Sequence, residues 1–255
     1  MSLTDEQSER YSRNILLDQI GVAGQEKLLA SKVLVVGLGG LGSPAVMYLA
    51  AAGVGTIGLL DGDEVDLTNL QRQLLHHTGD LGKRKAESAR ETIESLNPDV
   101  TIRLHDTWAR ADNLGPIARQ YDFVIDAVDN FEAKFLINDA CCAEQVAFCH
   151  AGILEFEGQL MTVLPGRTTC YRCVFTQPPT GTERARGVLG VLPGVIGALE
   201  ATEAIKYLLG LGGLLTDTLM TYDALTATFR KIPVARNQAC PACGFSRGTS
   251  ARSTP

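Results

Sequence analysis

KVLVVGLGGLGSPAVMYLAAAGVGTIGLLD, residues 32–61, holds a strand, a glycine-rich loop, a helix and a second strand in that order. The opening KVLVV is apolar and rich in β-branched residues, as in a strand buried on both faces of a parallel sheet. It leads directly into GLGGLG, a helix follows at SPAVMYLAAAG, and the second strand, TIGLL, stops before Asp61. A unit of this length that ends in an acidic residue is typical of the βαβ nucleotide-binding crossover.

The spaced glycines of the loop, Gly37, Gly39 and Gly42, favour a nucleotide site over a purely structural turn. Glycine permits a tight turn, close approach of the backbone to a phosphate, and tight packing of the helix that follows. The free amides at the N-terminus of that helix attract an anion. We expect Asp61 to accept hydrogen bonds from ribose hydroxyls. The motif alone does not distinguish NAD from ATP.

The polar segment after Asp61 favours a triphosphate. It carries Asn69, Arg72, Gln73 and Lys85 within a short reach of the ribose-binding acid. An arginine offers a planar fork to phosphate oxygens, and a lysine offers a mobile point charge. Both would stabilise the negative charge that builds when the α-phosphate is attacked. The alternative interpretation is an ordinary solvated polar loop.

A further strand, in YDFVIDAVDN at residues 121–130, ends in two acidic residues. Ligands bind at the carboxyl ends of strands in open α/β sheets, and carboxylates suit Mg²⁺. We therefore expect Asp129 to hold a magnesium ion on the phosphates. For Asp126 the alternative is a structural role as a cap.

Four of the seven cysteines form two Cys-x-x-Cys pairs, Cys170 with Cys173 and Cys240 with Cys243. In a reducing compartment such pairs indicate metal or redox chemistry rather than disulfides. Four thiolates would close a tetrahedral zinc site with no open position, so the zinc would be structural. A redox pair and unrelated buried thiols are the alternatives.

The other cysteines and the histidines show no metal-binding spacing. Cys141, Cys142 and Cys149 lie in helix and strand patterns, so we expect small core residues rather than nucleophiles. His76 and His77 are adjacent in a polar loop, and we expect both at the surface.

Composition excludes several classes of protein. Of the 255 residues 45% are hydrophobic, which is ample for a core, and 29 acidic against 23 basic residues give a net charge of −6. No block of like charge favours a nucleic-acid partner. The polar N-terminus lacks the apolar stretch of a signal peptide, and no uncharged apolar run reaches the roughly 18 residues of a membrane span. We expect a cytoplasmic protein without a membrane partner.

Periodicity along the chain predicts a single α/β domain over residues 1–244 and a disordered tail over 245–255. We expect a Rossmann-like, mostly parallel sheet extended by antiparallel strands, with N-terminal helices and a structural zinc site. The Pro/Gly-rich segment 177–187 predicts a mobile loop. The further expected elements are helical structure over 4–30 with Thr4 as cap and Gln7 three residues on, a helix through Ser95, a strand at 100–104, a helix to Ala143, strands at 146–152 and 158–166, a helix at 194–210, and a hairpin of 218–224 and 226–234.

Nine segments together resemble one family over residues 4–244: the bacterial adenylyltransferases of molybdopterin and thiamine biosynthesis, the MoeB/ThiF/HesA group, relatives of the ubiquitin-activating enzymes. The segments that carry the resemblance are RYSRNILL, VLVVGLGGLGSP, LLDGDEVDLTNLQRQ, GKRKAESA, DAVDN, GQLMTVLPG, CYRC, LPGVIGALEATEAIK and CPACG.

The resemblance implies an ATP- and Mg²⁺-dependent adenylyltransferase. Its partner would be a small ubiquitin-like sulfur-carrier protein whose C-terminal Gly-Gly carboxylate attacks the α-phosphate, giving an acyl-adenylate and pyrophosphate ahead of a thiocarboxylate. Arg13 is similar to an arginine that reaches the ATP of a neighbouring subunit, which implies a homodimer. Arg13, Asn69, Arg72, Lys85 and Asp129 are the implied catalytic set, and the four paired cysteines the zinc ligands. The nucleotide site would comprise Gly37, Gly39, Gly40, Gly42, Asp61, Asp63, Asn69, Arg72, Gln73, Lys85, Asp129 and Asn130.

This chain departs from the family in one loop. Many members carry a cysteine just before the segment that here begins at Gly187, and Glu183 stands at about that place. No cysteine occurs between Cys173 and Cys240. A mechanism that needs an enzyme thiol there is therefore not expected, whereas adenylation needs none. We also expect no rhodanese-like domain, so sulfur would come from a separate donor protein.

Two other functions remain open. An NAD-dependent oxidoreductase is supported by the glycine motif alone. A non-catalytic, zinc-stabilised carrier-binding module would keep the fold without turnover. The sequence does not identify the carrier, so the pathway, whether of molybdopterin, thiamine, cysteine or another sulfur product, stays open.

Overall fold

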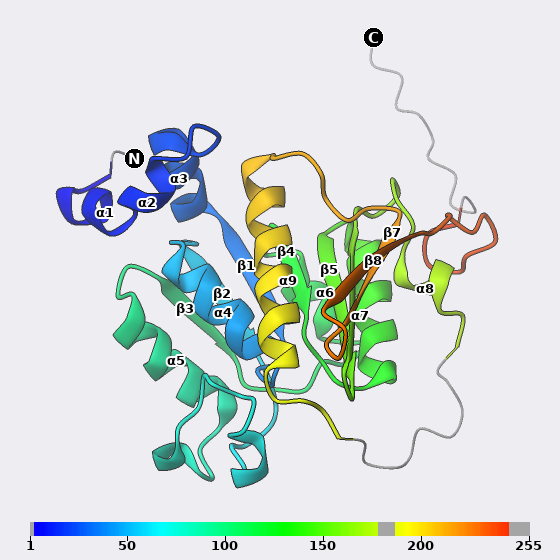
Figure 1. Ribbon diagram of the computed structural model, residues 1–255, viewed down its shortest axis with the longest axis horizontal. Coiled ribbons are helices and arrows are strands. Elements are labelled where there is room, and N and C mark those ends of the chain that lie inside the picture. The colour runs from blue at the N-terminus through cyan, green and yellow to red at the C-terminus, as the bar shows by residue number, and fades with distance from the viewer. Residues whose placement is uncertain (1–2, 178–186, 245–255) are drawn as a thin grey trace.

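The computed structural model describes residues 3–177 and 187–244, and these form one eight-stranded sheet with helices on both faces (Figure 1). The strands are β1 (Lys32–Val36), β2 (Thr56–Leu60), β3 (Thr101–His105), β4 (Phe123–Asp126), β5 (Ala147–Leu154), β6 (Glu157–Val163), β7 (Thr218–Asp223) and β8 (Thr228–Pro233). The helices are α1 (Asp5–Arg10), α2 (Ser12–Ile15), α3 (Gly21–Ala30), α4 (Gly42–Ala51), α5 (Lys85–Leu96), α6 (Leu114–Ala118), α7 (Phe131–Glu144), α8 (Tyr171–Val174) and α9 (Leu192–Leu209), with two 3₁₀ turns, η1 (Leu67–Asn69) and η2 (Thr78–Asp80).

The sheet has the order β3-β2-β1-β4-β5-β6-β7-β8. Its first five strands pair in parallel, and β6, β7 and β8 continue it antiparallel. The order 3-2-1-4-5 is that of a Rossmann-type sheet. The predicted mostly parallel sheet with an antiparallel extension is therefore confirmed, as is the terminal hairpin, which is β7 and β8.

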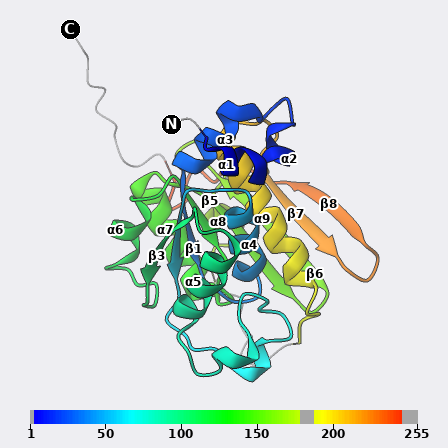
Figure 2. The same ribbon diagram turned by 90° about the vertical axis from the view of Figure 1, so that its left-hand side faces the viewer.

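Two hydrophobic cores sandwich the sheet. Figure 2 shows α4, α5 and α9 on one face of the sheet and α6 and α7 on the other. Apolar side chains of the first group pack together, and the four paired cysteines belong to the core on the second face. The strands β1, β2 and β4 are almost wholly buried, which explains their continuous apolar sequences. Cys141, Cys142 and Cys149 are buried in these cores, as expected.

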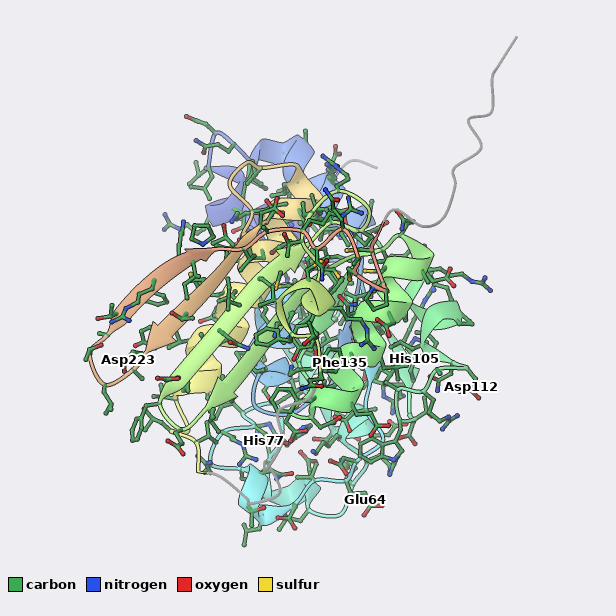
Figure 3. All side chains as sticks on the ribbon, turned by 90° about the vertical axis from the view of Figure 1, so that its right-hand side faces the viewer. Glu64, His77, His105, Asp112, Phe135 and Asp223 are labelled. Carbon is green, nitrogen blue, oxygen red and sulfur yellow. The ribbon has the colours of Figure 1, made fainter. Side chains whose placement is uncertain are left out.

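The N-terminal helices cover the amino edge of the parallel strands. Thr4 caps α1 in a capping box with Gln7, as the sequence predicts. The Gly55 N–H, just before β2, donates to the Leu28 carbonyl at 3.0 Å, and Asn97, just after α5, donates through its side chain to the Tyr11 hydroxyl at 2.8 Å. The glycine loop and the segment between β2 and α5 lie at the opposite, carboxyl edge (Figure 1). Glu64 and His77 of that segment lie at the end of the molecule away from the N-terminal helices (Figure 3).

Most of the proposed mobile loop 177–187 and the proposed tail 245–255 lie outside the described residues. Among the helices that the structure describes, none is long and apolar enough to span a bilayer.

Candidate nucleotide-binding site and cysteine centre

The glycine loop between β1 and α4 is too tightly packed for side chains at two of its positions. Gly37 has a φ of +95°, and a Cβ there would lie 2.8 Å from the Ala127 carbonyl oxygen. At Gly42 a Cβ would lie 2.0 Å from the Gly37 oxygen. Gly39 and Gly40 are less confined, since a Cβ would stay 3.1 Å or more from its neighbours. At these two positions, next to the first turn of α4, the nearest neighbours are side chains, those of Gln73 and Pro193, rather than backbone.

Asp61 holds this loop against the end of β2. Its carboxylate is 9% exposed and accepts hydrogen bonds from the Leu38 N–H at 2.7 Å and from the Asp63 N–H at 2.8 Å. A carboxylate has about four lone-pair sites, so two bonds leave acceptor capacity for the hydroxyls of a ribose. The predicted acid therefore lies beside the predicted loop.

The segment after β2 brings two of its predicted residues against the glycine loop. The Asn69 carbonyl accepts from the Arg72 N–H at 3.1 Å and from the Gln73 N–H at 3.0 Å, so a tight turn presents both side chains. The Arg72 Cδ would lie 3.5 Å from a Cβ on Gly40, and the Gln73 amide nitrogen 3.4 Å from one on Gly39.

Within the described residues, the buried Gln73 Oε1 has no hydrogen-bond partner, and Arg72 Nη1 is bonded to the Thr68 carbonyl at 3.1 Å. A guanidinium has five N–H donors, so this one backbone bond leaves Arg72 with donors for a ligand, and the Gln73 amide has no bond at its oxygen to lose.

Lys85, expected as a mobile charge, is instead buried and held in place. It is the first residue of α5 and 5% exposed, and its Nζ lies 3.0 Å from Asp63 Oδ2. Its backbone N–H also donates to the Asp63 carbonyl at 2.9 Å. The sequence did not indicate this burial, because a single lysine in a polar segment does not reveal that the segment folds back over it.

His76 was expected at the surface, and that expectation is wrong. The ring is 4% exposed, with Nδ1 2.9 Å from the Ser88 hydroxyl and Nε2 2.9 Å from the Leu38 carbonyl. Burial lowers the pKa of His76, and the two contacts of the ring link α5 to the glycine loop. His77 is exposed, as expected.

Asp129 and Asn130 follow β4 at the same carboxyl edge. Asp129 is exposed, and Asn130 is the N-cap of α7, where its side chain accepts from the Ala133 N–H at 2.8 Å. The cap of α7 is therefore Asn130 and not Asp126. Asp126 nevertheless has a structural place, since it is 1% exposed, accepts from the Val128 N–H at 3.4 Å and contacts Lys134 and His150.

Asp126, Lys134 and His150 form a buried polar cluster that the sequence did not indicate. Lys134 Nζ lies 3.3 Å from Asp126 Oδ1 and donates to the Ala151 carbonyl, while His150 Nδ1 lies 2.7 Å from Asp126 Oδ2. Burial disfavours the Asp126 carboxylate, but the charge of Lys134 and the His150 hydrogen bond outweigh it and hold its pKa below the usual range. Burial lowers the pKa of His150. The Val128 hydrogen bond ties the cluster to the loop of residues 127–130, which carries Asp129.

Cys170, Cys173, Cys240 and Cys243 gather their sulfurs within 4.8 Å of one another. The separation is 3.6 Å between Cys170 and Cys240 and 3.4 Å between Cys173 and Cys243. Tetrahedral zinc with bonds of about 2.3 Å separates its sulfurs by about 3.8 Å, whereas a disulfide is about 2.05 Å long. Four convergent thiols without further ligands fit structural zinc, which would tie the segment after β8 to α8.

Arg13 does not lie with the other predicted residues. It is exposed on α2, at the amino edge of the sheet. The five residues of β1 alone span about 16 Å between that edge and the glycine loop. The chain's own fold therefore does not bring Arg13 to its own nucleotide site.

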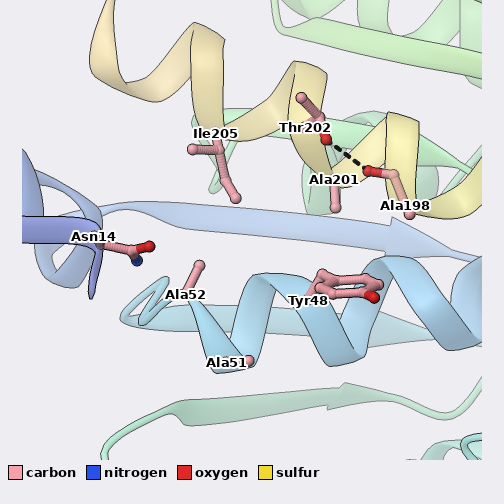
Figure 4. Close-up of a pocket in the computed structure, with 8 residues that line it drawn as sticks. All are labelled: Asn14, Tyr48, Ala51, Ala52, Ala198, Ala201, Thr202 and Ile205. Carbon is pink, nitrogen blue, oxygen red and sulfur yellow. Dashed lines mark hydrogen bonds between the residues drawn. The ribbon is translucent and has the colours of Figure 1, made fainter. Parts of the chain in front are cut away.

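A pocket of about 350 Å³ lies near α2, between α4 and α9 (Figure 4). Small side chains line most of it, because α4 and α9 pack closely there. The lining residues are Asn14, Tyr48, Ala51, Ala52, Ala198, Ala201, Thr202 and Ile205. No lining residue is acidic, basic, histidine or cysteine, so this pocket lacks the chemistry of the carboxyl edge.

Sequence comparisons find relatives along almost the whole chain. The profile of the ThiF family matches residues 11–242. The "SAMP-activating enzyme E1" of Haloferax volcanii is 45% identical over 248 residues, with 96% of this chain and 92% of the relative covered. The "Sulfur carrier protein adenylyltransferase" of Thermus thermophilus is 43% identical over 253 residues, with 96% and 93% covered. "Adenylyltransferase and sulfurtransferase MOCS3" of Culex quinquefasciatus is 45% identical, but only 56% of its length is matched.

A similar solved structure is that of Escherichia coli MccB crystallised with ATP. It is 25% identical, has a TM-score of 0.83, and is matched over 92% of this chain and 74% of its own.

Proposed function

Because the chain belongs to the ThiF family and its relatives are named adenylyltransferases of sulfur-carrier proteins, we propose that it adenylylates the C-terminal carboxylate of a ubiquitin-like sulfur carrier. The observation that carries the proposal is local. Arg72 lies against the glycine loop, and the buried Lys85 is paired to Asp63 just beyond Asp61. An NAD site needs no such cations beside the ribose acid.

In this proposal ATP lies across the carboxyl edge of the sheet. Asp61 accepts from the ribose hydroxyls, and the backbone at Gly39 and Gly40 approaches the phosphates at the N-terminus of α4. Arg72, Lys85 and the side chains of Asn69 and Gln73 donate to phosphate oxygens. Asp129 is the exposed carboxylate that would hold Mg²⁺, which neutralises phosphate charge when bound.

The reaction needs positioning and charge stabilisation rather than an enzyme nucleophile. A carboxylate oxygen of the carrier's C-terminal glycine attacks the α-phosphorus, its new P–O bond forms as the bond to the β-phosphate oxygen breaks, and pyrophosphate leaves. No proton is transferred. Lys85, held by Asp63, and Arg72, which lies against the glycine loop, would donate to the oxygens on which charge builds. A sulfide-level sulfur from a separate donor would then attack the acyl carbon, so that the C–S bond of the thiocarboxylate forms as the bond between the acyl carbon and the AMP oxygen breaks and AMP leaves.

Zinc has a structural role in this scheme. The four thiolates fill its coordination shell, so the metal supplies a cross-link between α8 and the segment after β8 rather than a place for substrate.

We further propose that two copies pair and exchange Arg13. The amino-edge face beside the pocket exposes apolar side chains, with Leu16 71%, Leu17 51% and Tyr48 59% accessible. Burying this face against a second copy would remove that surface from water, and the exposed Arg13 would then face the partner subunit. Arg13 would then serve the partner's ATP.

A complementation experiment tests the exchange. Arg13→Ala and Lys85→Ala are each expected to lack activity alone. When the two variants are mixed and their subunits exchange, about half of the dimers contain one subunit of each. Each such dimer has one intact site out of two, so about a quarter of wild-type activity should return. If the mixture stays inactive although light scattering shows dimers, Arg13 acts in its own chain or not at all.

Pyrophosphate exchange into ATP tests the reaction itself. The purified protein is assayed with Mg²⁺ and a panel of small carriers that end in Gly-Gly, each beside a copy that lacks the tail. Exchange only with intact tails is expected, and it would identify the carrier. An oxidoreductase would bind NAD in preference to Mg·ATP and show no exchange.

Arg72→Ala separates an enzyme from a binding module. Carrier binding should survive the substitution in either case, because Arg72 faces the glycine loop. Only an enzyme would lose exchange.

A further inference from the structure

Trp108 is the single tryptophan of the chain and lies in the segment between β3 and α6 with 57% of its surface exposed. Its indole rests on Gly62, the residue after Asp61. A Cβ on Gly62 would lie 2.7 Å from Trp108 Cδ2 and 2.8 Å from both Cε2 and Cγ. A point equally distant from these three ring atoms lies above the face of the ring rather than at its edge. One face of the indole therefore covers Gly62, and much of the ring stays exposed.

The segment that carries Trp108 is tied to the nucleotide segment. Asp106 Oδ1 accepts from Arg84 Nε at 2.8 Å, and Arg84 is the residue before Lys85. Arg84 also lies 4.0 Å from Glu64. The Trp108 carbonyl accepts from the Asn113 side chain at 3.0 Å, which fixes the backbone at the indole. These bonds hold the backbone on either side of the indole, and the ring itself lies on Gly62, the residue after Asp61.

Without a ligand, the indole leaves apolar surface exposed to water. A tryptophan that is more than half exposed gains only part of the free energy that burial would give. The indole can lie here only because residue 62 is a glycine, since any side chain there would displace the ring. The pair Gly62 and Trp108 thus presents a flat aromatic surface next to the acid proposed to bind ribose.

We propose that Trp108 stacks on the adenine of bound ATP. The inference rests on the proposed nucleotide site but not on the carrier reaction. Because β2 lies between β1 and β3, the segment after β3 lies on the side of Asp61 away from the glycine loop. A ribose held by Asp61, with its phosphates at Gly39 and Gly40, would direct its base to that side. The indole is the aromatic surface that lies there. Stacking tolerates any purine, so Trp108 contributes to the affinity for ATP rather than to the choice of base.

The single tryptophan makes the contact directly measurable. Indole emission, excited where tyrosine absorbs little, should fall saturably as Mg·ATP is added to the zinc-loaded protein. Inorganic tripolyphosphate should compete with ATP for the site and leave the emission unchanged, because it has no base.

The decisive comparison is Trp108→Ala against Trp108→Phe in calorimetric titrations. Trp108→Ala should weaken ATP binding roughly 5- to 150-fold, the loss of one base–aromatic stack, and leave tripolyphosphate binding unchanged. Trp108→Phe should recover most of the affinity. Equal weakening for ATP and tripolyphosphate would mean that the indole only supports the segment, and it would overturn the proposal. So would an ATP affinity within twofold of wild type.

These outcomes are separable from those of the proposed reaction. Carrier-dependent pyrophosphate exchange combined with no ATP-specific effect of Trp108→Ala would overturn the stacking alone. Emission quenched by ATP, with no exchange for any carrier of the panel, would support the stacking and contradict the adenylylation.

Discussion

Lys85 Nζ lies 3.0 Å from Asp63 Oδ2, and the lysine side chain is 6% exposed while that of the aspartate is 51% exposed. The ammonium group is therefore fixed by one carboxylate that water can still reach. An incoming phosphate would add a second anion on the same cation without first having to order the lysine, because the protein has already paid that entropy.

Replacing Lys85 should consequently impair the reaction more than the fold. Lys85→Ala is expected to lower pyrophosphate exchange roughly 10²- to 10³-fold, as the loss of one fixed donor does. Initial rates at saturating ATP measure the effect. Lys83→Ala is the matched control, since Lys83 pairs with Asp80 and Glu91 in a more exposed position and should change the rate less than twofold. Equal losses in both variants would contradict a specific role for Lys85.

Removing zinc should destabilise the protein without removing the nucleotide site. One zinc per chain is expected from atomic absorption. A chelator should lower the melting temperature by about 10 °C, since a ligand at a thousandfold excess over its Kd contributes about 4 kcal/mol.

Two cysteine variants provide the contrast. Cys170→Ser should lower zinc content, whereas Cys149→Ala, in the buried strand β5, should retain one zinc per chain. A wild-type protein with no bound metal and no response to chelator would contradict the zinc assignment.

The sheet and the glycine loop could be predicted because their signals are local. Continuous apolar sequences mark β1, β2 and β4, and the glycine spacing marks a turn that Gly37 and Gly42 indeed require. The four cysteines were predictable as two local pairs, although only the fold shows that the pairs meet.

The buried charges could not be predicted in the same way. Asp126, Lys134 and His150 come from a strand, a helix and the neighbouring strand, and they meet only because β4 lies beside β5. Trp108 likewise becomes a candidate ligand contact only because it touches Gly62, which is distant in sequence. Residue type and periodicity carry no information about such contacts until the strand order is known.

Glu200 should lower stability at neutral pH. Within the described residues both of its carboxyl oxygens are buried without a hydrogen-bond partner. Burial, with a smaller contribution from the negative Asp126, raises the pKa of Glu200 well above its usual range. The folded state therefore keeps a proton that the unfolded state releases, and stability falls as pH rises above the pKa of an unfolded glutamate, about 4.3.

Glu200→Gln removes this dependence because an amide stays neutral. The variant should match the wild type near pH 4 and melt at a progressively higher temperature than the wild type toward pH 8. Thermal unfolding across that range measures the difference. Glu94→Gln, at an exposed position of α5, should show no such trend. A variant that is less stable than wild type at pH 8 would show that the carboxyl has a partner.

The buried ion pair between Lys134 and Asp126 should contribute more to the free energy of unfolding than a surface ion pair does. Lys134→Met leaves a buried carboxylate without its cation and is expected to cost about 3–5 kcal/mol of unfolding free energy. Denaturant titrations at pH 7 measure it. Because Lys134 holds the pKa of Asp126 low, the pair's contribution is present above the pKa of an unfolded aspartate and is lost as pH falls. The destabilisation should therefore shrink in acid.

Two further variants check this explanation. Lys134→Arg keeps the charge and should restore most of the stability. Asp126→Asn combined with Lys134→Met removes both charges and should be more stable than Lys134→Met alone. A double variant whose cost equals the sum of the two single costs would show that the residues do not interact.

Adenylylation by this protein should resist thiol reagents. Six of the seven cysteines are buried, and Cys173, the partly exposed one, belongs to the metal-binding set. Burial raises the pKa of Cys141 and of Cys149, which keeps both as unreactive thiols. Treating the zinc-loaded protein with iodoacetamide should therefore leave carrier-dependent pyrophosphate exchange within twofold of the untreated rate. The treated protein should also show unchanged mass by mass spectrometry. Loss of exchange together with alkylation at a single cysteine would mean that an enzyme thiol takes part, and Cys173 would then be the first residue to replace.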